Sequence, residues 1–315
     1  MNNALLLDQN DFRVLNARKA ENGLRQAYQV AGKDHYLFLK TFGIHIRVCE
    51  YGTGEPVLIV PGNTGDSFVF MPLIAQLTGR KVLALNRPGG GLSEGFNHHA
   101  TGFKTMAINT IDTILEYFRL GSVPIIAHSM GGHWSLWYAI ARPQRVESLT
   151  LLGVPGNVMN CKPPFALRLA SVPGLNRLLF SRISPKTAST ALRGLRLMGH
   201  SNETIVRLPS AMADCYFHFQ KLPHYETSSL SLMETTNTLF GSKADIRITE
   251  SELGKVRQNV SMIWGTNDPF GSVKNGEEIV AALPNPMFHT ISDGGHLPWL
   301  DSPKQCGKLI AEFLG

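Results

Sequence analysis

A single serine stands between an apolar run and a segment rich in small residues, in Ile125-Ile-Ala-His-Ser-Met-Gly-Gly132. A serine hydroxyl is a weak nucleophile, so chemistry at Ser129 would need a general base and donors for the developing oxyanion. A sharp strand-to-helix turn would expose this hydroxyl and point the backbone N–H of Met130 towards a reacting carbonyl. Gly131 and Gly132 would keep the turn sterically open. Taken alone, a Ser-x-Gly of this kind is more often a helix N-cap than a nucleophile.

Two further residues supply the partners that a nucleophilic serine needs. Asp268 follows an apolar run in Trp264-Gly-Thr-Asn-Asp-Pro269, and His296 follows the last such run in Gly294-Gly-His-Leu-Pro298. The interval between them leaves room for one helix and one strand, so both would lie on neighbouring loops at one end of a sheet. We expect His296 to act as general base on Ser129, and Asp268 to orient the imidazole and stabilise its charged form.

The elements that must position these residues alternate along the chain, and this alternation indicates an open α/β sheet. Runs that are apolar on both faces are typical of strands covered on both sides, as in a parallel sheet. The predicted strands are 57–60, 81–85, 123–127, 148–152, 260–264 and 287–291, preceded by a hairpin of 36–39 and 44–49 around Gly43. The predicted helices are 70–77, 105–119, 131–142, 274–283 and 302–314.

Residues 155–254 interrupt this alternation. The segment contains no clear buried strand, and it has helix-like stretches at 164–170 and 189–198 that are separated by prolines. Lys and Arg outnumber Asp and Glu in it. A helical insert between two strands predicts a cap over the strand ends, where open α/β sheets bind ligands. The expected domains are therefore a helical N-terminal extension (1–35), a core (36–154 and 255–315) and a cap (155–254).

Together these features resemble the α/β-hydrolase fold superfamily, in which the nucleophile elbow follows a G-x-S-x-G pattern and the triad runs Ser, Asp, His along the chain. Ala127 replaces the first glycine of the pattern, and Ser129, Asp268 and His296 keep the order. The resemblance covers the proposed core. It implies an α/β-hydrolase fold with a mostly parallel sheet flanked by helices and an inserted helical cap.

The resemblance also places the second oxyanion donor in the loop after the first long strand. The family usually has His-Gly-x at this point, whereas this chain has Pro61-Gly-Asn-Thr-Gly65. By position, the backbone N–H of Asn63 would be the donor, paired with that of Met130. Pro61 replaces the histidine that usually braces the loop, but a backbone donor can survive that replacement.

Other features are interpreted as structural. Pro88-Gly-Gly-Gly91 lacks the spacing of a dinucleotide or phosphate loop and is expected to form a turn. Asp293 is a competing carboxylate near His296, but it is expected to face solvent. Trp134 and Trp137 are expected to lie in the core. His128 is expected to have no acid–base role. His98, His99 and His218 are not expected to bind a metal. Met212, Phe217, Phe219 and the apolar positions of 164–176 could line an acyl pocket, although packing within the cap is favoured.

Composition bounds the remaining possibilities. The chain has 315 residues, a formal charge of +6 and four widely spaced cysteines. No run of basic residues predicts nucleic-acid binding, and no 18-residue apolar stretch predicts a membrane span. The N-terminus lacks the basic region of a secretory signal, and isolated cysteines suit a reducing compartment, so a cytoplasmic location is expected. No cofactor or metal is expected, and the protein would be a monomer or a homodimer.

The leading interpretation is a serine hydrolase that cleaves a small-molecule carboxylic ester, thioester or lactone through an acyl-enzyme. A C–C hydrolase of a β-diketone-type substrate and an acyltransferase remain alternatives, because the same triad serves all three. A ligand-binding receptor on a hydrolase scaffold is the non-enzymatic alternative.

Overall fold

A central sheet organises the computed structural model, which describes residues 4–63, 66–100 and 102–315. Its strands are β2 (Gly32–Leu39), β3 (Ile44–Tyr51), β4 (Glu55–Val60), β5 (Arg80–Asn86), β7 (Val123–His128), β8 (Val146–Leu152), β11 (Asn259–Gly265) and β12 (Pro286–Ile291). These eight strands lie in the order β12-β11-β8-β7-β4-β5-β3-β2. Within the sheet, β3 runs against its neighbours, since it pairs antiparallel with both β2 and β5. The predicted hairpin and the predicted mostly parallel sheet are both confirmed.

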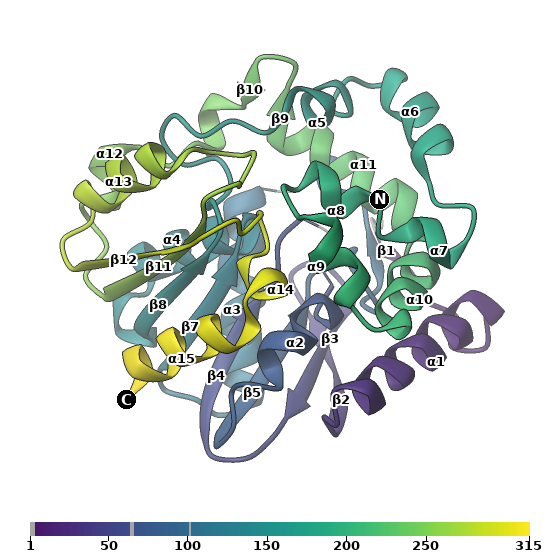
Figure 1. Ribbon diagram of the computed structural model, residues 1–315, viewed down its shortest axis with the longest axis horizontal. Coiled ribbons are helices and arrows are strands. Elements are labelled where there is room, and N and C mark those ends of the chain that lie inside the picture. The colour runs from purple at the N-terminus through teal and green to yellow at the C-terminus, as the bar shows by residue number, and fades with distance from the viewer. Residues whose placement is uncertain (1–3, 64–65, 101) are drawn as a thin grey trace.

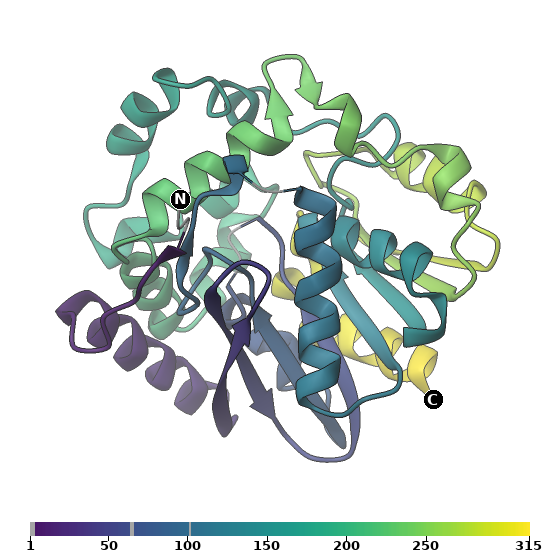
Figure 2. The ribbon, with the colours of Figure 1, turned by 180° about the vertical axis from the view of Figure 1, so that it is seen from behind.

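Helices cover both faces of the sheet (Figures 1 and 2). In β7, Ile125 packs into the core on one face and Ile126 into the core on the other, as the two-residue period of a strand requires. This double burial explains why the central strands are apolar throughout. One face carries α3 (Phe103–Tyr117), α4 (Met130–Ala141) and α13 (Val273–Ala281), and the other carries α2 (Met71–Ile74), α14 (Pro298–Asp301) and α15 (Pro303–Leu314).

The N-terminal extension packs against both the sheet edge and the insert. Its helix α1 (Phe12–Ala27) lies along α10 (Ser210–Phe219). Met212 of α10 is fully buried in the core cluster that also contains Val14 and Leu24 of α1. Glu21 of α1 forms a 2.6 Å ion pair with the buried Arg47 of β3. A two-residue strand, β1 (Ala4–Leu5), pairs with β6 (Gly95–Phe96).

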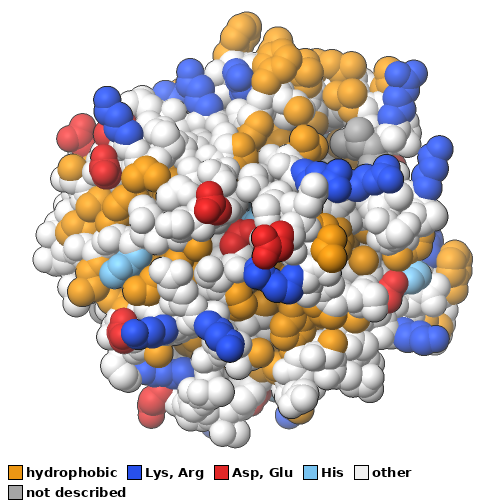
Figure 3. Space-filling model, viewed as in Figure 1, with side chains coloured by type: hydrophobic (Ala, Val, Ile, Leu, Met, Phe, Trp, Pro, Cys, Tyr) orange, Lys and Arg blue, Asp and Glu red, His pale blue; other side chains and the backbone are white. Residues whose placement is uncertain are grey.

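The insert, residues 155–254, is mainly helical. Its elements are α5 (Phe165–Leu169), α6 (Leu175–Ile183), α7 (Ala188–Ala191), α8 (Gly194–Leu197), α9 (Asn202–Arg207), α10, α11 (Tyr225–Thr236) and α12 (Glu250–Leu253), with a small hairpin of β9 (Asn237–Thr238) and β10 (Gly241–Ser242). Figure 3 shows hydrophobic side chains on the outer surface over α5, the β9–β10 hairpin and α6. Within the described residues, no helix has the length and apolar character to cross a bilayer.

The prediction of one helix at 189–198 is wrong. The chain forms α7 and α8 instead, joined by i→i+3 hydrogen bonds such as Arg193 N–H to Thr190 O and Leu195 N–H to Leu192 O. Gly194 lies at this junction, and glycine is about 1 kcal/mol less favourable than alanine inside a helix. The strands β9 and β10 were not predicted, because two residues are too few to give a recognisable run.

Several residues that were predicted to have structural roles lie where such roles require them. Gly89 and Gly91 have φ values of 76° and 53° in a buried turn. Trp134 and Trp137 are buried in the core. Asp293 is exposed, as predicted.

Candidate active site

Three parallel strands bring the predicted catalytic residues to one edge of the sheet. Ser129 follows β7, Asp268 lies three residues beyond β11, and His296 lies in the loop after β12. These strands run parallel with β8 between the first two, so their carboxyl ends lie side by side. The three residues therefore lie at the same edge of the sheet, and Asp268 and His296 are in direct contact.

The carboxylate of Asp268 fixes the imidazole of His296. Asp268 Oδ2 lies 2.8 Å from His296 Nδ1 and also accepts a 3.0 Å hydrogen bond from the backbone N–H of Val154. Asp268 Oδ1 accepts a 2.9 Å bond from the N–H of Phe270, whose ring stacks on the imidazole at 3.9 Å between centroids. A proton on Nδ1 is thereby held by the carboxylate, which leaves Nε2 able to accept a proton.

Ser129 sits in a strained turn at the start of α4. Its φ and ψ are 50° and −118°, a conformation that non-glycine residues rarely adopt. The turn packs tightly, because a Cβ on Gly131 would lie 2.1 Å from the carbonyl oxygen of Val60. The N–H of Gly156 donates to the Ser129 carbonyl at 2.9 Å and holds the turn from the insert side. Met130 is the first residue of α4, and an N–H at that position has no acceptor within its own helix.

Arg87, which the sequence analysis did not single out, braces the predicted oxyanion loop. Its Nε donates to the carbonyl of Gly62 at 2.9 Å, and its Nη2 donates to the carbonyl of Asn63 at 2.8 Å. The carbonyl of Gly62 belongs to the same peptide unit as the N–H of Asn63, so Arg87 both orients and polarises that donor. Thr64 and Gly65 of the same motif lie outside the described residues.

Burial shifts the pKa values of Arg87 and Asp66, which lie near the loop of Gly62 and Asn63. Arg87 is almost fully buried, and burial lowers its pKa to about 10, so it remains protonated at neutral pH. The ring of Trp134 lies 5.1 Å from its guanidinium carbon, in a cation–π contact. Burial also raises the pKa of the nearby Asp66 to about 8. At neutral pH the cation is therefore available to hold the loop.

His128 holds the loop of His296 through a hydrogen bond to its backbone. Burial lowers its pKa well below the usual value, so the ring is neutral at neutral pH. Its Nε2 lies 3.0 Å from the carbonyl oxygen of His296, which can only accept, so Nε2 carries the proton. His128 is therefore a hydrogen-bond donor to the backbone. This structural role agrees with the sequence-based prediction, which gave His128 no part in acid–base chemistry.

A buried network around Asp301 attaches the His296 loop to the insert. Asp301 Oδ2 accepts 2.9 Å hydrogen bonds from the backbone N–H of Gly295 and from His200 Nδ1, while Oδ1 accepts a 2.8 Å bond from the hydroxyl of Thr204. His200 and Thr204 belong to the insert. Sequence analysis missed this network, because its members lie about a hundred residues apart and match no motif.

The predicted nucleophile and base are both shielded from solvent. Ser129 is 8% exposed and His296 is 3% exposed. The insert contacts the backbone of the histidine directly, because the N–H of His296 donates to the carbonyl of Met198, at the end of α8, at 2.8 Å.

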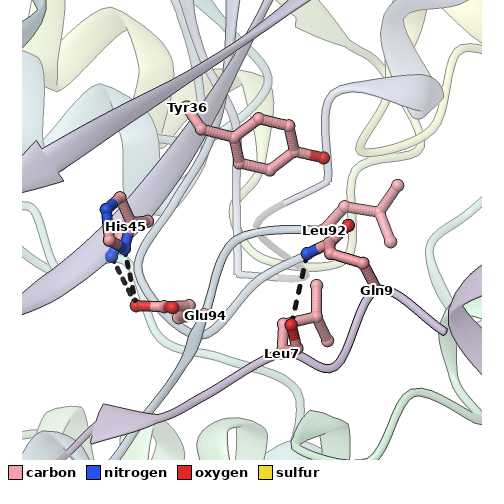
Figure 4. A pocket seen from close by; sticks show the side chains of 6 residues that line it. All are labelled: Leu7, Gln9, Tyr36, His45, Leu92 and Glu94. Atoms are coloured by element: carbon pink, nitrogen blue, oxygen red, sulfur yellow. Dashed lines mark hydrogen bonds and ion pairs between the residues drawn. The ribbon is translucent and has the colours of Figure 1, made fainter. Parts of the chain in front are cut away.

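Two surface pockets lie apart from the serine. One, of about 490 Å³, is lined by the loop after β11, including Asp268 and Phe270, together with Asn160 and Lys162. The other, of about 350 Å³, lies where the N-terminal segment meets β2 and β3 (Figure 4). Its lining residues are Leu7, Gln9, Tyr36, His45, Leu92 and Glu94, and none of the predicted catalytic residues is among them.

Comparison with known proteins agrees with this fold. Residues 55–303 match the family model described as the alpha/beta hydrolase fold. The chain belongs to the α/β-hydrolase fold family. The predicted fold is confirmed, and so is hydrolysis as the class of reaction.

Relatives of this α/β-hydrolase include both C–C hydrolases and esterases. A 2-hydroxy-6-oxononadienedioate/2-hydroxy-6-oxononatrienedioate hydrolase of Cupriavidus pinatubonensis is 25% identical over 312 residues, covering 92% of this chain and 98% of the relative. Among solved structures, the naproxen esterase of Bacillus subtilis superposes with a TM-score of 0.74 at 14% identity, covering 97% of this chain and 99% of the other. The 2-hydroxy-6-oxo-6-phenylhexa-2,4-dienoate hydrolase of a Rhodococcus species has a TM-score of 0.72 at 17% identity, covering 90% and 99%.

Proposed function

We propose that this α/β-hydrolase cleaves a small-molecule carboxylic ester, thioester or lactone through an acyl-enzyme on Ser129. The observation that carries the proposal is the 2.8 Å contact between Asp268 and His296, which leaves Nε2 of the imidazole available on the strand edge where Ser129 lies. The strained backbone of Ser129 supports it, because strain of this kind persists where the surrounding structure enforces it and is common at active sites.

The reaction would proceed in two halves. His296 Nε2 takes the proton of the Ser129 hydroxyl while Oγ attacks the substrate carbonyl, and the backbone N–H groups of Asn63 and Met130 stabilise the oxyanion. The tetrahedral intermediate collapses, and His296 gives its proton to the leaving alcohol or thiol. A water molecule then loses a proton to His296 and attacks the acyl-enzyme. Release of the acid returns the proton to Ser129, with Asp268 stabilising the imidazolium in each half.

Cleavage of a C–C bond is the second candidate. The curated relatives that span nearly the whole chain hydrolyse 2-hydroxy-6-oxo dienedioates and trienedioates, by their names. In such a reaction Ser129 would attack the ketone, and His296 would protonate the carbanionic carbon that leaves. The acyl-enzyme and its hydrolysis would be the same as for an ester.

The insert would act as the cap of this site. Its attachment to the His296 loop through Met198, His200 and Thr204, together with the low exposure of Ser129, supports that role. We also propose a cytoplasmic location, which the four buried, free cysteines support, since exported proteins more often pair their cysteines.

A burst assay with p-nitrophenyl esters of several chain lengths tests the proposal. We expect about one nitrophenolate per chain in the burst, and a loss of kcat of about 10⁴-fold or more in Ser129→Ala. Ser181→Ala, which changes an exposed serine of the insert, is the matched control and should retain full activity.

A parallel assay with 2-hydroxy-6-oxononadienedioate, the substrate named for the relatives, separates the two candidates. Turnover of the dienedioate without any ester burst would replace ester hydrolysis by C–C hydrolysis. A cooperative thermal transition shows that the chain is folded. If the folded chain turned over neither substrate, this would count against catalysis by this site.

A further inference from the structure

One stretch of the insert carries positive charge without any acidic counterpart. Between Glu147 and Glu203 the sequence contains no Asp or Glu, although it contains seven basic residues. These are Lys162, Arg168, Arg177, Arg182, Lys186, Arg193 and Arg196. Such a block of one sign is unusual in a chain whose remaining charges are mixed, and it gives this side of the insert a positive field.

Exposed apolar side chains lie on the same side. Phe165 on α5 is 58% exposed, Leu178 on α6 is 49% exposed, and Phe240 at the tip of the β9–β10 hairpin is 83% exposed. Arg168 joins α5 to the hairpin, because it stacks over the ring of Phe165 and donates to the carbonyl of Leu239 at 3.2 Å. In Figure 3 these elements form the upper edge of the molecule, where hydrophobic side chains are flanked by Lys and Arg.

The apolar side chains of α5 and α6 contribute little to the core. None of the five residues of α5 is buried, and in the described part of α6 only Asn176 is buried. Asn176 Nδ2 lies 2.5 Å from Glu234 Oε1, and the ring of Phe180 lies 5.8 Å from that of Tyr225. Helices with exposed leucine and arginine side by side, and few inward contacts, have the composition of helices that lie in a membrane interface.

The acidic groups close to this surface do not neutralise it. Glu234 is occupied on its inner side by Asn176 and by His99 at 2.7 Å. Asp245 is exposed beyond the hairpin, but it lies between Lys243 and Arg247 in the sequence. The exposed side chains of α5 and α6 are therefore apolar or cationic apart from Ser181, and none is acidic, which suits an anionic surface with an apolar interior.

We propose that this surface, hereafter the α5–α6 face, docks the protein onto membranes that contain anionic lipid. The α5–α6 face comprises Phe165, Leu175, Leu178 and Phe240 with Lys162, Arg168, Arg177, Arg182 and Lys186. Its apolar side chains enter the boundary between headgroups and acyl chains, and its basic side chains bind lipid phosphates. The proposal does not depend on the chemistry at Ser129.

Co-sedimentation with vesicles tests the docking. The full chain is mixed at low ionic strength with vesicles of phosphatidylcholine alone, or of phosphatidylcholine and phosphatidylglycerol in equal amounts. We expect at least about tenfold stronger partitioning onto the anionic vesicles, and a return towards the neutral value as salt screens the charges.

Two double variants locate the contact. Phe165→Ser with Phe240→Ser, and Arg177→Glu with Arg182→Glu, should each weaken partitioning at least about tenfold. The matched controls are Phe12→Ser, which removes a 70% exposed aromatic on α1, and Lys304→Glu with Lys308→Glu on α15, and both should bind like the native chain. The thermal midpoint of each variant checks that the fold is retained.

Three results would overturn the proposal. Equal binding to neutral and anionic vesicles would remove the electrostatic basis. Equal losses in the control variants would show that binding is not confined to the α5–α6 face. A concentration-dependent dimer in sedimentation velocity that the Phe165 and Phe240 changes abolish would assign the face to a second copy of this chain.

Discussion

The two ends of the insert differ in how they are held. The inner part, α8 to α10, is tied to the core by the Asp301 network and by α10, whose Met212 is fully buried in the core. The outer part, α5 and α6, has few buried side chains and leaves Phe165 and Leu178 exposed. All of these helices have at most ten residues, so helix length alone does not explain the difference.

The difference indicates a division of labour within one insert. The inner part contacts the backbone beside His296, so it must keep a defined position if the imidazole is to stay oriented. Among the described residues of α5 and α6, no hydrogen bond reaches the loops of Ser129, Asp268 or His296, and side chains such as Phe165 and Leu178 are exposed to an external surface. Four experiments can break or sharpen this comparison.

Removal of Asp301 should have the largest effect. In Asp301→Ala the N–H of Gly295, His200 and the hydroxyl of Thr204 all lose a buried acceptor, which should lower the free energy of unfolding by about 3–5 kcal/mol. The value of kcat should also fall at least about tenfold, because the His296 loop is released from the insert.

Urea denaturation and ester kinetics measure these two effects. Glu312→Ala, on the exposed side of α15, is the control and should change stability by less than about 0.5 kcal/mol. Native stability and kcat in Asp301→Ala would refute the idea that the inner part positions the catalytic loop.

A pair of truncations compares the packing of the two parts directly. Met212→Ala should destabilise the protein by about 3 kcal/mol, because it opens a cavity at a fully buried position of α10. Leu178→Ala on α6 should cost less than about 0.5 kcal/mol, because half of that side chain is already exposed. Equal shifts in the urea midpoint would mean that both parts pack alike.

Arg87 offers a comparison between core-side and insert-side arginines. Arg87→Lys should reduce kcat about tenfold with little change in KM, because a lysine cannot donate to the carbonyls of Gly62 and Asn63 as a planar fork does. Arg177→Lys on α6 should leave both constants unchanged. A change confined to KM in Arg87→Lys would argue that Arg87 serves substrate binding rather than the oxyanion loop.

Hydrogen exchange should reveal the smallest difference. Backbone amides of α6 should exchange at least about tenfold faster than those of α10, because regions with few buried contacts open at lower free energy. Mass spectrometry of peptides from the native chain measures both helices in one experiment. Equal protection would mean that the outer part is held by contacts as strong as those of the inner part.

Much of this organisation could be predicted from the sequence, because local patterns carry it. The central strands are recognisable in the sequence because they are apolar on both faces. Ser129, Asp268 and His296 each follow such a strand, in the order that the family's triad has along the chain. The break between α7 and α8 was missed, since a single glycine gives only a weak local signal. Arg87 was overlooked because its role depends on the carbonyls of a distant loop. Asp301 carried no signal at all, since its partners meet only after folding.

The most direct test of the central claim is covalent labelling with a fluorophosphonate, which reacts with an activated serine. Peptide mass spectrometry should find the label on Ser129. Labelling should be lost in Ser129→Ala and slowed at least about 10²-fold in His296→Ala, because the base that activates the hydroxyl is gone. A label on a different serine, or a rate that does not depend on His296, would contradict the assignment of Ser129, His296 and Asp268 as the catalytic residues of this hydrolase.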